Sequence, residues 1–179
     1  MKHYCRVDSP IGHLLLTADG DALTGLYMGT PSKQPALDAW REQPSADVLT
    51  ETARQLKEYF AGSRRSFDLP LHMAGTEFQQ RVWRELTKIP FGETWSYGQL
   101  AKRIGNSNAS RAVGLANGRN PIAVIVPCHR VIGADGSLTG FGGGLPRKQW
   151  LLSHEGLPGT KALALDARLG RGVAAYASA

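Results

Sequence analysis

Two helix-start signals in the second half of the chain most constrain what it can fold into. Thr76 is followed three residues later by Gln79, and Ser96 is followed by Gln99 in the same way. Each pair has the form of a capping box, in which the hydroxyl and the amide side chain satisfy each other's backbone N–H. A third helix is expected over about residues 109–116, after a short turn rich in Gly and Asn. Short helices joined by such a turn predict a helix-turn-helix.

The outer face of the third helix is unusual, because Arg111 is its one long, charged side chain. A helix that reads the major groove normally offers several polar side chains to the bases. A helix of small residues can instead lie close against a narrower groove while Arg111 inserts into the DNA. Tight packing between helices favours the same residues, so both interpretations stay open. The small residues are Ala109, Ser110, Ala112, Gly114 and Ala116.

Cys128 and His129 place a thiol beside an imidazole at a stiff point of the backbone. They follow the apolar run 122–126, which a proline brackets at each end. A free thiol has a pKa of about 8.5, so Cys128 needs a base to become a nucleophile, and His129 is the candidate. Neighbouring side chains on an extended backbone point opposite ways, so a water or a bent backbone is required. A buried, unreactive cysteine is the alternative.

Three further residues are candidates for the same site. Glu155 lies just beyond a helix that Pro146 is expected to open, and it is the candidate to orient the imidazole. Asn120 precedes the apolar run and can satisfy backbone groups at the turn, while Tyr97 offers a phenol at the start of the second helix. The glycine-rich segment 140–144 lets backbone approach a ligand closely.

The first half of the chain carries no chemical constellation and is expected to be structural. Residues 29–44 contain three prolines and are expected to form a surface connection. Asp19-Gly20-Asp21 is a strong hairpin signal. The expected elements are strands over 4–7, 14–17 and 23–27, a helix from 45 to about 61, and in the second half a hairpin turn over 134–137 that adds a wing.

Charge is unevenly spread along the chain. Residues 74–157 carry ten Lys or Arg against five Asp or Glu, whereas residues 1–73 carry eight against nine. A basic half beside a neutral half predicts a polyanionic partner, and charge that serves only solubility is the alternative. No apolar stretch approaches the roughly 20 residues of a membrane span, and no signal peptide is expected. Cys5 and Cys128 are therefore expected to be free thiols, and no zinc-site spacing occurs.

Ordered motifs over residues 76–156 resemble the O6-alkylguanine-DNA alkyltransferase family, and the first half of the chain resembles it more loosely. The segment around Cys128 is similar to the family's active-site signature. The similar segments, in chain order, are 94–101 (TWSYGQLA), 110–114 (SRAVG), 117–121 (NGRNP), 127–133 (PCHRVIG), 143–145 (GGL), 148–152 (KQWLL) and 154–156 (HEG).

The resemblance implies two domains. Residues 1–73 would form an α/β domain similar to ribonuclease H, with a linker at about 63–75, and residues 74–157 a winged helix-turn-helix domain that holds the active site. The tail, 158–179, is expected to be mobile or loosely docked. The family binds duplex DNA through the minor groove and flips the damaged nucleotide into a pocket.

The resemblance also implies a role for each candidate residue. Cys128 would accept the alkyl group, with His129 as its water-mediated base and Glu155 as the orienting carboxylate. Asn120 would shape the turn, and Tyr97 would hydrogen-bond the guanine base.

On the DNA side, Arg111 would fill the gap left in the base stack. Phe141 and Gly142 stand where some members carry Tyr and Ser, which leaves the preference between O6-alkylguanine and O4-alkylthymine open. The expected DNA contacts are Tyr97, Ser110, Arg111, Ala112, Gly114 and Arg119, and the expected pocket residues are Tyr97, Val126, Pro127, Phe141, Gly142 and Gly143.

A thioether on Cys128 offers no carbonyl for water to attack, so the protein is expected to act once and to need no cofactor or metal. It is expected to be a cytoplasmic monomer, with cooperative assembly on DNA left open. Two other classes stay open. A sensor that binds alkylated DNA without repairing it would not need Cys128, and a cysteine hydrolase would need an oxyanion hole and would turn over.

Overall fold

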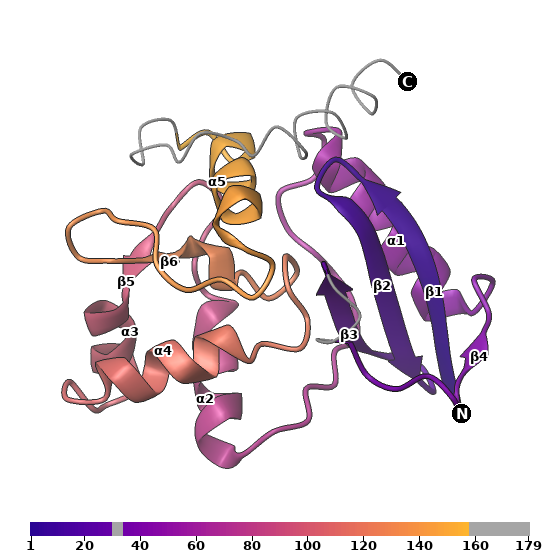
Figure 1. Cartoon of the computed structure of the whole chain (residues 1–179), viewed down its shortest axis with the longest axis horizontal. Helices are drawn as coiled ribbons and strands as arrows, with labels where there is room; N and C mark the ends of the chain where they lie inside the picture. The colour runs from indigo at the N-terminus through magenta and orange to yellow at the C-terminus, as the bar shows by residue number, and fades with distance from the viewer. Residues whose placement is uncertain (30–33, 158–179) are drawn as a thin grey trace. The chain divides into compact units, whose positions relative to one another are not determined.

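The computed structural model describes residues 1–29 and 34–157, which form two compact units that divide between Met73 and Ala74 (Figure 1). The first unit is built on a sheet and the second is mainly helical, which confirms the predicted fold class. The predicted tail, 158–179, lies outside the described residues, as do residues 30–33 of the predicted surface connection. In the described part of the chain, no helix has the length and apolar character that a membrane crossing requires.

The first unit contains a four-stranded sheet in the order β3-β2-β1-β4. Its strands are β1 (Lys2–Ser9), β2 (Gly12–Asp19), β3 (Ala22–Met28) and β4 (Arg41–Glu42). The first three form an antiparallel meander, as predicted, and Gly20 adopts a φ of 57° in the expected hairpin turn. β4 pairs in parallel with β1 and was not predicted, because two residues show no periodicity.

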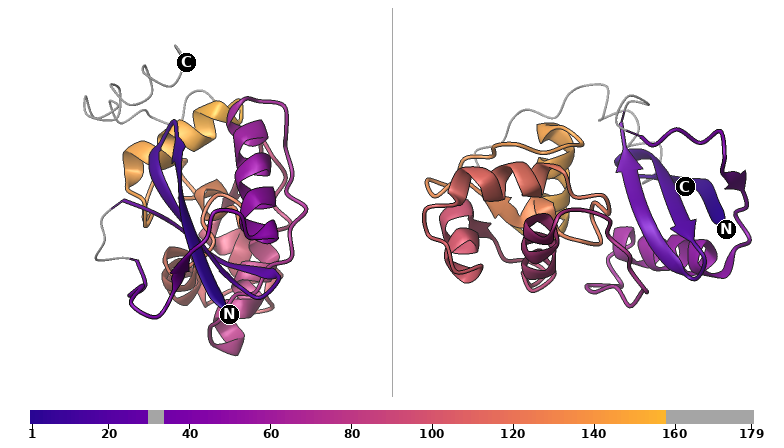
Figure 2. Two further views of the ribbon diagram at one scale, coloured as in Figure 1. Left: turned by 90° about the vertical axis from the view of Figure 1, so that its right-hand side faces the viewer. Right: turned by 90° about the horizontal axis from the view of Figure 1, so that it is seen from below.

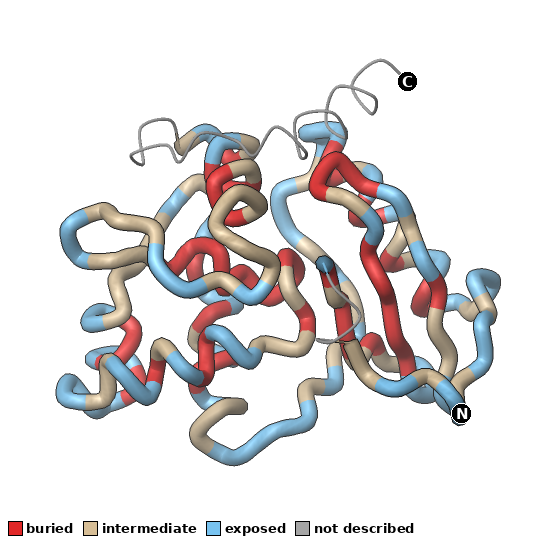
Figure 3. The backbone as a smooth tube through the Cα atoms, in the orientation of Figure 1, coloured by how far each residue is buried: buried red, intermediate tan, exposed pale blue. Residues whose placement is uncertain are grey.

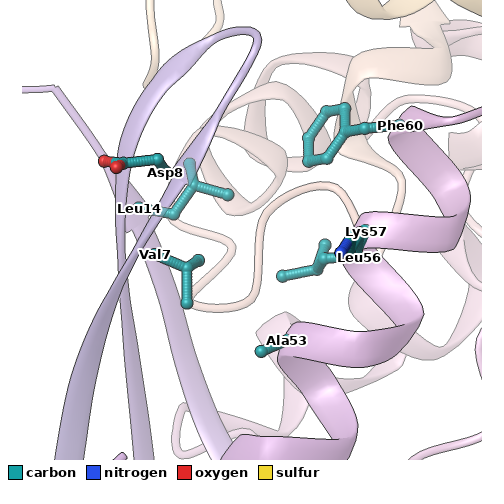
Figure 4. A pocket seen from close by; sticks show the side chains of 7 residues that line it. All are labelled: Val7, Asp8, Leu14, Ala53, Leu56, Lys57 and Phe60. Carbon is teal, nitrogen blue, oxygen red and sulfur yellow. The ribbon is translucent and has the colours of Figure 1, made fainter. Parts of the chain in front are cut away.

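Helix α1 (Asp47–Phe60) lies across one face of this sheet (Figures 1 and 2). Its buried apolar side chains include Val48, Leu49 and Leu56, and Tyr59 is fully buried beside them. β2 is buried along most of its length and forms the centre of this core (Figure 3). A cavity of about 170 Å³ remains between helix and sheet (Figure 4). Its lining residues are Val7, Asp8, Leu14, Ala53, Leu56, Lys57 and Phe60.

The segment expected to be a linker is partly held by the sheet. Leu23 N–H donates to the carbonyl of Pro70 at 2.8 Å, and His72 N–H donates to the carbonyl of Leu23 at 2.9 Å. Leu71 thereby forms a parallel bridge with Leu23. Residues 70–72 therefore belong to the first unit, a tertiary pairing that their own composition does not signal.

The second unit carries the helix-turn-helix. Both predicted capping boxes form: Thr76 and Gln79 exchange bonds of 3.0 and 3.2 Å, and Ser96 and Gln99 exchange bonds of 2.8 and 3.1 Å. Its elements are α2 (Glu77–Leu86), β5 (Trp95–Ser96), α3 (Tyr97–Arg103), α4 (Ser110–Gly118), the 3₁₀ turn η2 (Cys128–Arg130), β6 (Val131–Ile132) and α5 (Leu145–His154).

The predicted wing takes a different form. Its turn is present, since Gly133 N–H donates to Ser137 O at 2.9 Å and Gly136 has a φ of 82°. However, the strand before the turn, β6, pairs in parallel with β5 rather than with a second wing strand. Residues 138–144 return toward α5 without strand pairing in the described chain.

Candidate active site

Helix α4 presents a different outer face from the one predicted. Arg111 and Ala112 are exposed, as expected, but Ala116 is buried because α4 docks there against α2, where Trp83 Nε1 donates to the Ala116 carbonyl at 2.9 Å. Leu115, which was not predicted to face outward, is 64% exposed. The other predicted DNA contacts on this helix are half-buried at Ser110 and Gly114, and Arg119 just beyond it is exposed.

Asn120 organises the turn that leads into the site, as predicted. Its Nδ2 donates to the carbonyl of Val126 at 2.7 Å, and its Oδ1 accepts the N–H of Ile122 at 3.0 Å. Between them, Val124 is held at a φ of 71°, a strained conformation for a buried β-branched residue. The side chain of Asn120 therefore closes a strained loop directly before Cys128.

The backbone at Cys128 is bent, not extended. Pro127 has φ −82° and ψ 63°, and the N–H of Cys128 bonds across it to the carbonyl of Val126 at 2.8 Å, the geometry of an inverse γ-turn. Cys128 then begins the 3₁₀ turn η2. This meets one of the two conditions under which adjacent Cys128 and His129 can act together.

Cys128 is 4% exposed. Burial raises its pKa, while a hydrogen bond from Asn120, the positive charge of Lys148 and backbone N–H groups oppose that rise. Cys5, the other free cysteine, is also buried, and burial together with Glu42 raises its pKa to about 11. The net effect is a raised pKa, so the Cys128 thiol stays protonated at rest, but unlike Cys5 it has groups around it that lower its pKa and would stabilise a thiolate once a base removes the proton.

His129 lies in a buried charge network with Glu155. Its Nε2 is 2.8 Å from Oε1 of Glu155, and both side chains are fully buried. Burial lowers the pKa of His129, and the nearby cations Arg130 and Lys148 lower it further, whereas Glu155 raises it. The ring is therefore neutral at rest. With Nε2–H turned to Glu155, Nδ1 is the free base, and within the described residues this buried atom has no hydrogen-bond partner.

Arg130 was not predicted as part of the site, yet it holds Glu155 in place. Its Nε and Nη2 donate to the two carboxylate oxygens at 2.8 and 2.9 Å, and its Nη1 donates to the Ile89 carbonyl at 2.7 Å. Burial by itself would raise the pKa of Glu155, but the bonds from His129 and Arg130 hold that pKa well below its usual range. The carboxylate is therefore permanently ionised.

Tyr97 lies at the meeting point of three segments. Its hydroxyl donates to the carbonyl of Thr139 at 2.7 Å. A Cβ on Gly140 would lie 3.7 Å from that hydroxyl, and a Cβ on Gly114 would lie 3.7 Å from the ring. The start of α3, the middle of α4 and the glycine-rich segment thus come together, which sequence order alone does not show.

The other residues that were expected to line the pocket differ in how far they are buried. Val126 and Pro127 are buried directly before Cys128, and Phe141 is half-buried. A Cβ on Gly142 would lie 3.7 Å from the carbonyl of Gly118 at the end of α4. In the described residues, no cluster of three or more metal-ligating side chains occurs.

Two family models match almost all of the described chain. One is described as the ribonuclease-like domain of 6-O-methylguanine DNA methyltransferase and matches residues 2–73; the other is described as its DNA binding domain and matches residues 77–157. The chain belongs to the 6-O-methylguanine DNA methyltransferase family. The resemblance drawn from the motifs is thereby confirmed.

Relatives of this methyltransferase cover nearly its whole length. The methylated-DNA–protein-cysteine methyltransferase of Mycobacterium tuberculosis is 54% identical over 155 residues, which cover 87% of this chain and 93% of the relative. That of Methanosarcina acetivorans is 52% identical, with 86% and 98% covered. The crystal structure of M. tuberculosis OGT in complex with DNA has a TM-score of 0.82 at 53% identity, covering 86% of this chain and 93% of that one.

Two charged residues of the methyltransferase site were missed from sequence, Arg130 and Lys148. Lys148 is fully buried and donates to the carbonyls of Val131 and Thr139. Both residues lie within the segments that resemble the family, at 127–133 and 148–152, so the motif match was the available signal. Nothing in local sequence distinguishes them from exposed cations.

Proposed function

We propose that this protein repairs alkylated duplex DNA by transferring the alkyl group of O6-alkylguanine to Sγ of its own Cys128, once per molecule. The observation that carries the proposal is the setting of that thiol: Cys128 is buried next to His129, whose Nε2 is held by Glu155 at 2.8 Å. The site lies in the unit that matches the DNA binding domain of the family.

Proton transfer precedes attack. The proton of Cys128 passes through a bridging water to Nδ1 of His129, while Glu155 stabilises the imidazolium through Nε2–H. The thiolate then attacks the sp³ carbon of the alkyl group, a C–S bond forms, and the C–O6 bond breaks. The electron pair of that bond stays on guanine, which takes up the proton as the normal base. The sum is thiol plus O6-alkylguanine giving thioether plus guanine.

Tyr97 is the group that would stabilise the departing base. Its hydroxyl donates to the Thr139 carbonyl in the free protein and can turn to the guanine ring once a base enters. Backbone groups around Gly142 and Gly143 would line the rest of the pocket with Val126 and Phe141. The missing hydroxyls at Phe141 and Gly142 leave room for bulkier alkyl groups or O4-alkylthymine.

Helix α4 would lie in the minor groove, with Arg111 filling the gap that the flipped nucleotide leaves. The side chains on its outer face are small, apart from Arg111, Leu115 and, just beyond the helix, Arg119. The ten basic and five acidic residues of 74–157 favour a phosphate backbone as partner. The relative solved in complex with DNA supports this choice of partner.

The reaction should leave the protein spent, because the thioether on Cys128 cannot be hydrolysed as a thioester can. No cofactor is required. We expect a monomer in solution and a cytoplasmic location, since free thiols at Cys5 and Cys128 suit a reducing compartment.

The test is to mix the protein with duplex DNA that bears O6-methylguanine, digest the protein and determine the mass of its peptides. One methyl group on Cys128 per protein is the expected result. Bound but unrepaired lesions would identify a sensor, and repeated turnover would identify a hydrolytic enzyme. Cys128→Ser should abolish transfer and retain DNA binding, and transfer that survives it would remove Cys128 from the role.

A further inference from the structure

Lys148 is a buried cation that pairs with no carboxylate in the described part of the chain. Its side chain is fully buried in α5, and its Nζ donates to the carbonyl of Val131 at 2.5 Å and to that of Thr139 at 3.0 Å. An ammonium has three N–H donors, so one remains beyond these two bonds. Among the described residues, no ion pair includes Lys148.

Such a burial is costly, and it calls for a physical reason. Removing an ammonium from water is strongly unfavourable unless a counter-charge or dipoles compensate for the lost hydration. Two carbonyl dipoles compensate part of that cost. A methionine of similar length would fill the same space without it, so the charge itself is the property that needs explaining.

The titratable groups that face Lys148 are those of the active site. The charge of Lys148 lowers the pKa of Cys128, and Cys128 in turn raises the pKa of Lys148. Lys148 also lowers the pKa of His129. Burial lowers the pKa of Lys148 to about 8, so the ammonium is still charged near neutral pH. The Tyr97 hydroxyl and this ammonium both donate to the carbonyl of Thr139.

The two carbonyls that Lys148 holds are both attached to the site. Val131 follows η2, and its N–H bonds back to the carbonyl of Cys128. The carbonyl of Thr139 accepts the Tyr97 hydroxyl at 2.7 Å as well as Nζ of Lys148. Through these bonds one side chain connects the turn that carries the thiol with the start of the glycine-rich segment.

We propose that Lys148 is a positioning residue for alkyl transfer, whose buried ammonium serves as the counter-charge of the Cys128 thiolate and fixes the Thr139 carbonyl beside Tyr97. This inference rests on the proposed function, in which Cys128 reacts as a thiolate. His129 removes the proton, and Lys148 keeps the resulting anion stable in a dry site. Proton removal by His129 in η2 and stabilisation of the thiolate by Lys148 in α5 are thus separate roles.

The first experiment compares wild type with Lys148→Met, which keeps length and removes charge. Reaction of Cys128 with iodoacetamide is followed from pH 6 to 10 by peptide mass, without DNA. The variant should react at least ten-fold more slowly at pH 7.5, with an apparent Cys128 pKa at least one unit higher, and the difference should shrink as pH rises. Transfer from O6-methylguanine DNA should fall by at least the same factor.

Lys88→Met is the matched control, because Lys88 is an exposed lysine of the same unit. It removes one positive charge from the DNA-binding unit and should leave the pH profile of Cys128 unchanged. An unchanged profile in Lys148→Met, or a loss that is constant at every pH, overturns the inference. Failure of the wild type to accept a methyl group from DNA overturns the proposed function instead, because the iodoacetamide reaction needs no DNA.

A second measurement needs no variant and decides the matter if Lys148→Met does not fold. The Cε resonance of Lys148 is followed against pH in protein with ¹³C-labelled lysine, before and after methylation of Cys128. A thioether carries no charge, so methylation should lower the pKa of Lys148, by at least half a unit. An identical titration before and after methylation contradicts the pairing.

Discussion

The carboxylate of Glu155 lies 2.8 Å from Nε2 of His129 and also accepts two hydrogen bonds from Arg130, at 2.8 and 2.9 Å. Because a permanent cation shares the carboxylate, Glu155 stays ionised and does not take the proton from the imidazole. It orients the ring and stabilises its charged form when that form appears. The pairing therefore leaves Nδ1 as the nitrogen of His129 that can accept a proton.

Replacing Glu155 by Gln should damage both the reaction and the fold. The amide leaves Arg130 buried without a counter-ion, which costs about 3 kcal/mol of unfolding free energy. It also allows the other ring tautomer, so the transfer rate should fall about 100-fold. Denaturant unfolding and single-turnover transfer measure the two effects. Glu93→Gln, at an exposed glutamate of the same unit, should change neither. Normal transfer by the Glu155 variant would contradict the orienting role.

The free energy of unfolding should decrease as the pH drops below about 6.5, which is the pKa of a histidine in an unfolded chain. Burial lowers the pKa of His129 in the folded state. Below pH 6.5 the unfolded chain therefore binds a proton at this histidine while the folded chain does not, and protonation favours the unfolded state. The free energy of unfolding should therefore decrease as pH drops toward 5, and His129→Gln should remove that part of the slope. His72→Gln, at an exposed histidine, is the control. Equal slopes in wild type and His129→Gln would show that His129 is not the group concerned.

The outer face of α4 should determine duplex affinity without affecting the thiol. Arg111 and Leu115 are one helical turn apart and both are exposed. Leu115→Glu would bring a carboxylate against the phosphate backbone and should weaken duplex binding at least ten-fold, whereas Leu115→Ala should stay within about three-fold. The iodoacetamide rate of Cys128 should match wild type in both. Unchanged duplex affinity in Leu115→Glu would place the DNA on another face.

Filling the cavity beside α1 should stabilise the first unit (Figure 4). Ala53→Leu adds three carbons to a residue that lines this cavity together with Val7 and Leu56, and cavity-filling changes of this kind contribute about 1 kcal/mol. Thermal unfolding should show a higher Tm, with alkyl transfer unaffected. Ala61→Leu, at the exposed end of the helix, adds the same atoms outside the cavity and should give no rise. A lower Tm in Ala53→Leu would mean that the cavity cannot accept the side chain.

The sequence alone determined the features whose causes lie within a few residues. The capping boxes at Thr76 and Ser96 and the hairpin turn at Gly20 were predicted and are present, because each is a bond or dihedral set between near neighbours. The motif around Cys128 identified the family, since its residues stand together in the chain.

The tertiary structure alone decided which side chains meet. Lys148 bonds to carbonyls 17 and 9 residues away, and Arg130 reaches Glu155 across 25 residues. Leu115 is exposed and Ala116 is buried because α4 packs against Trp83 of α2 at Ala116. Burial of a cation is favourable only where distant dipoles and counter-charges already converge, and that convergence exists only once the chain has folded.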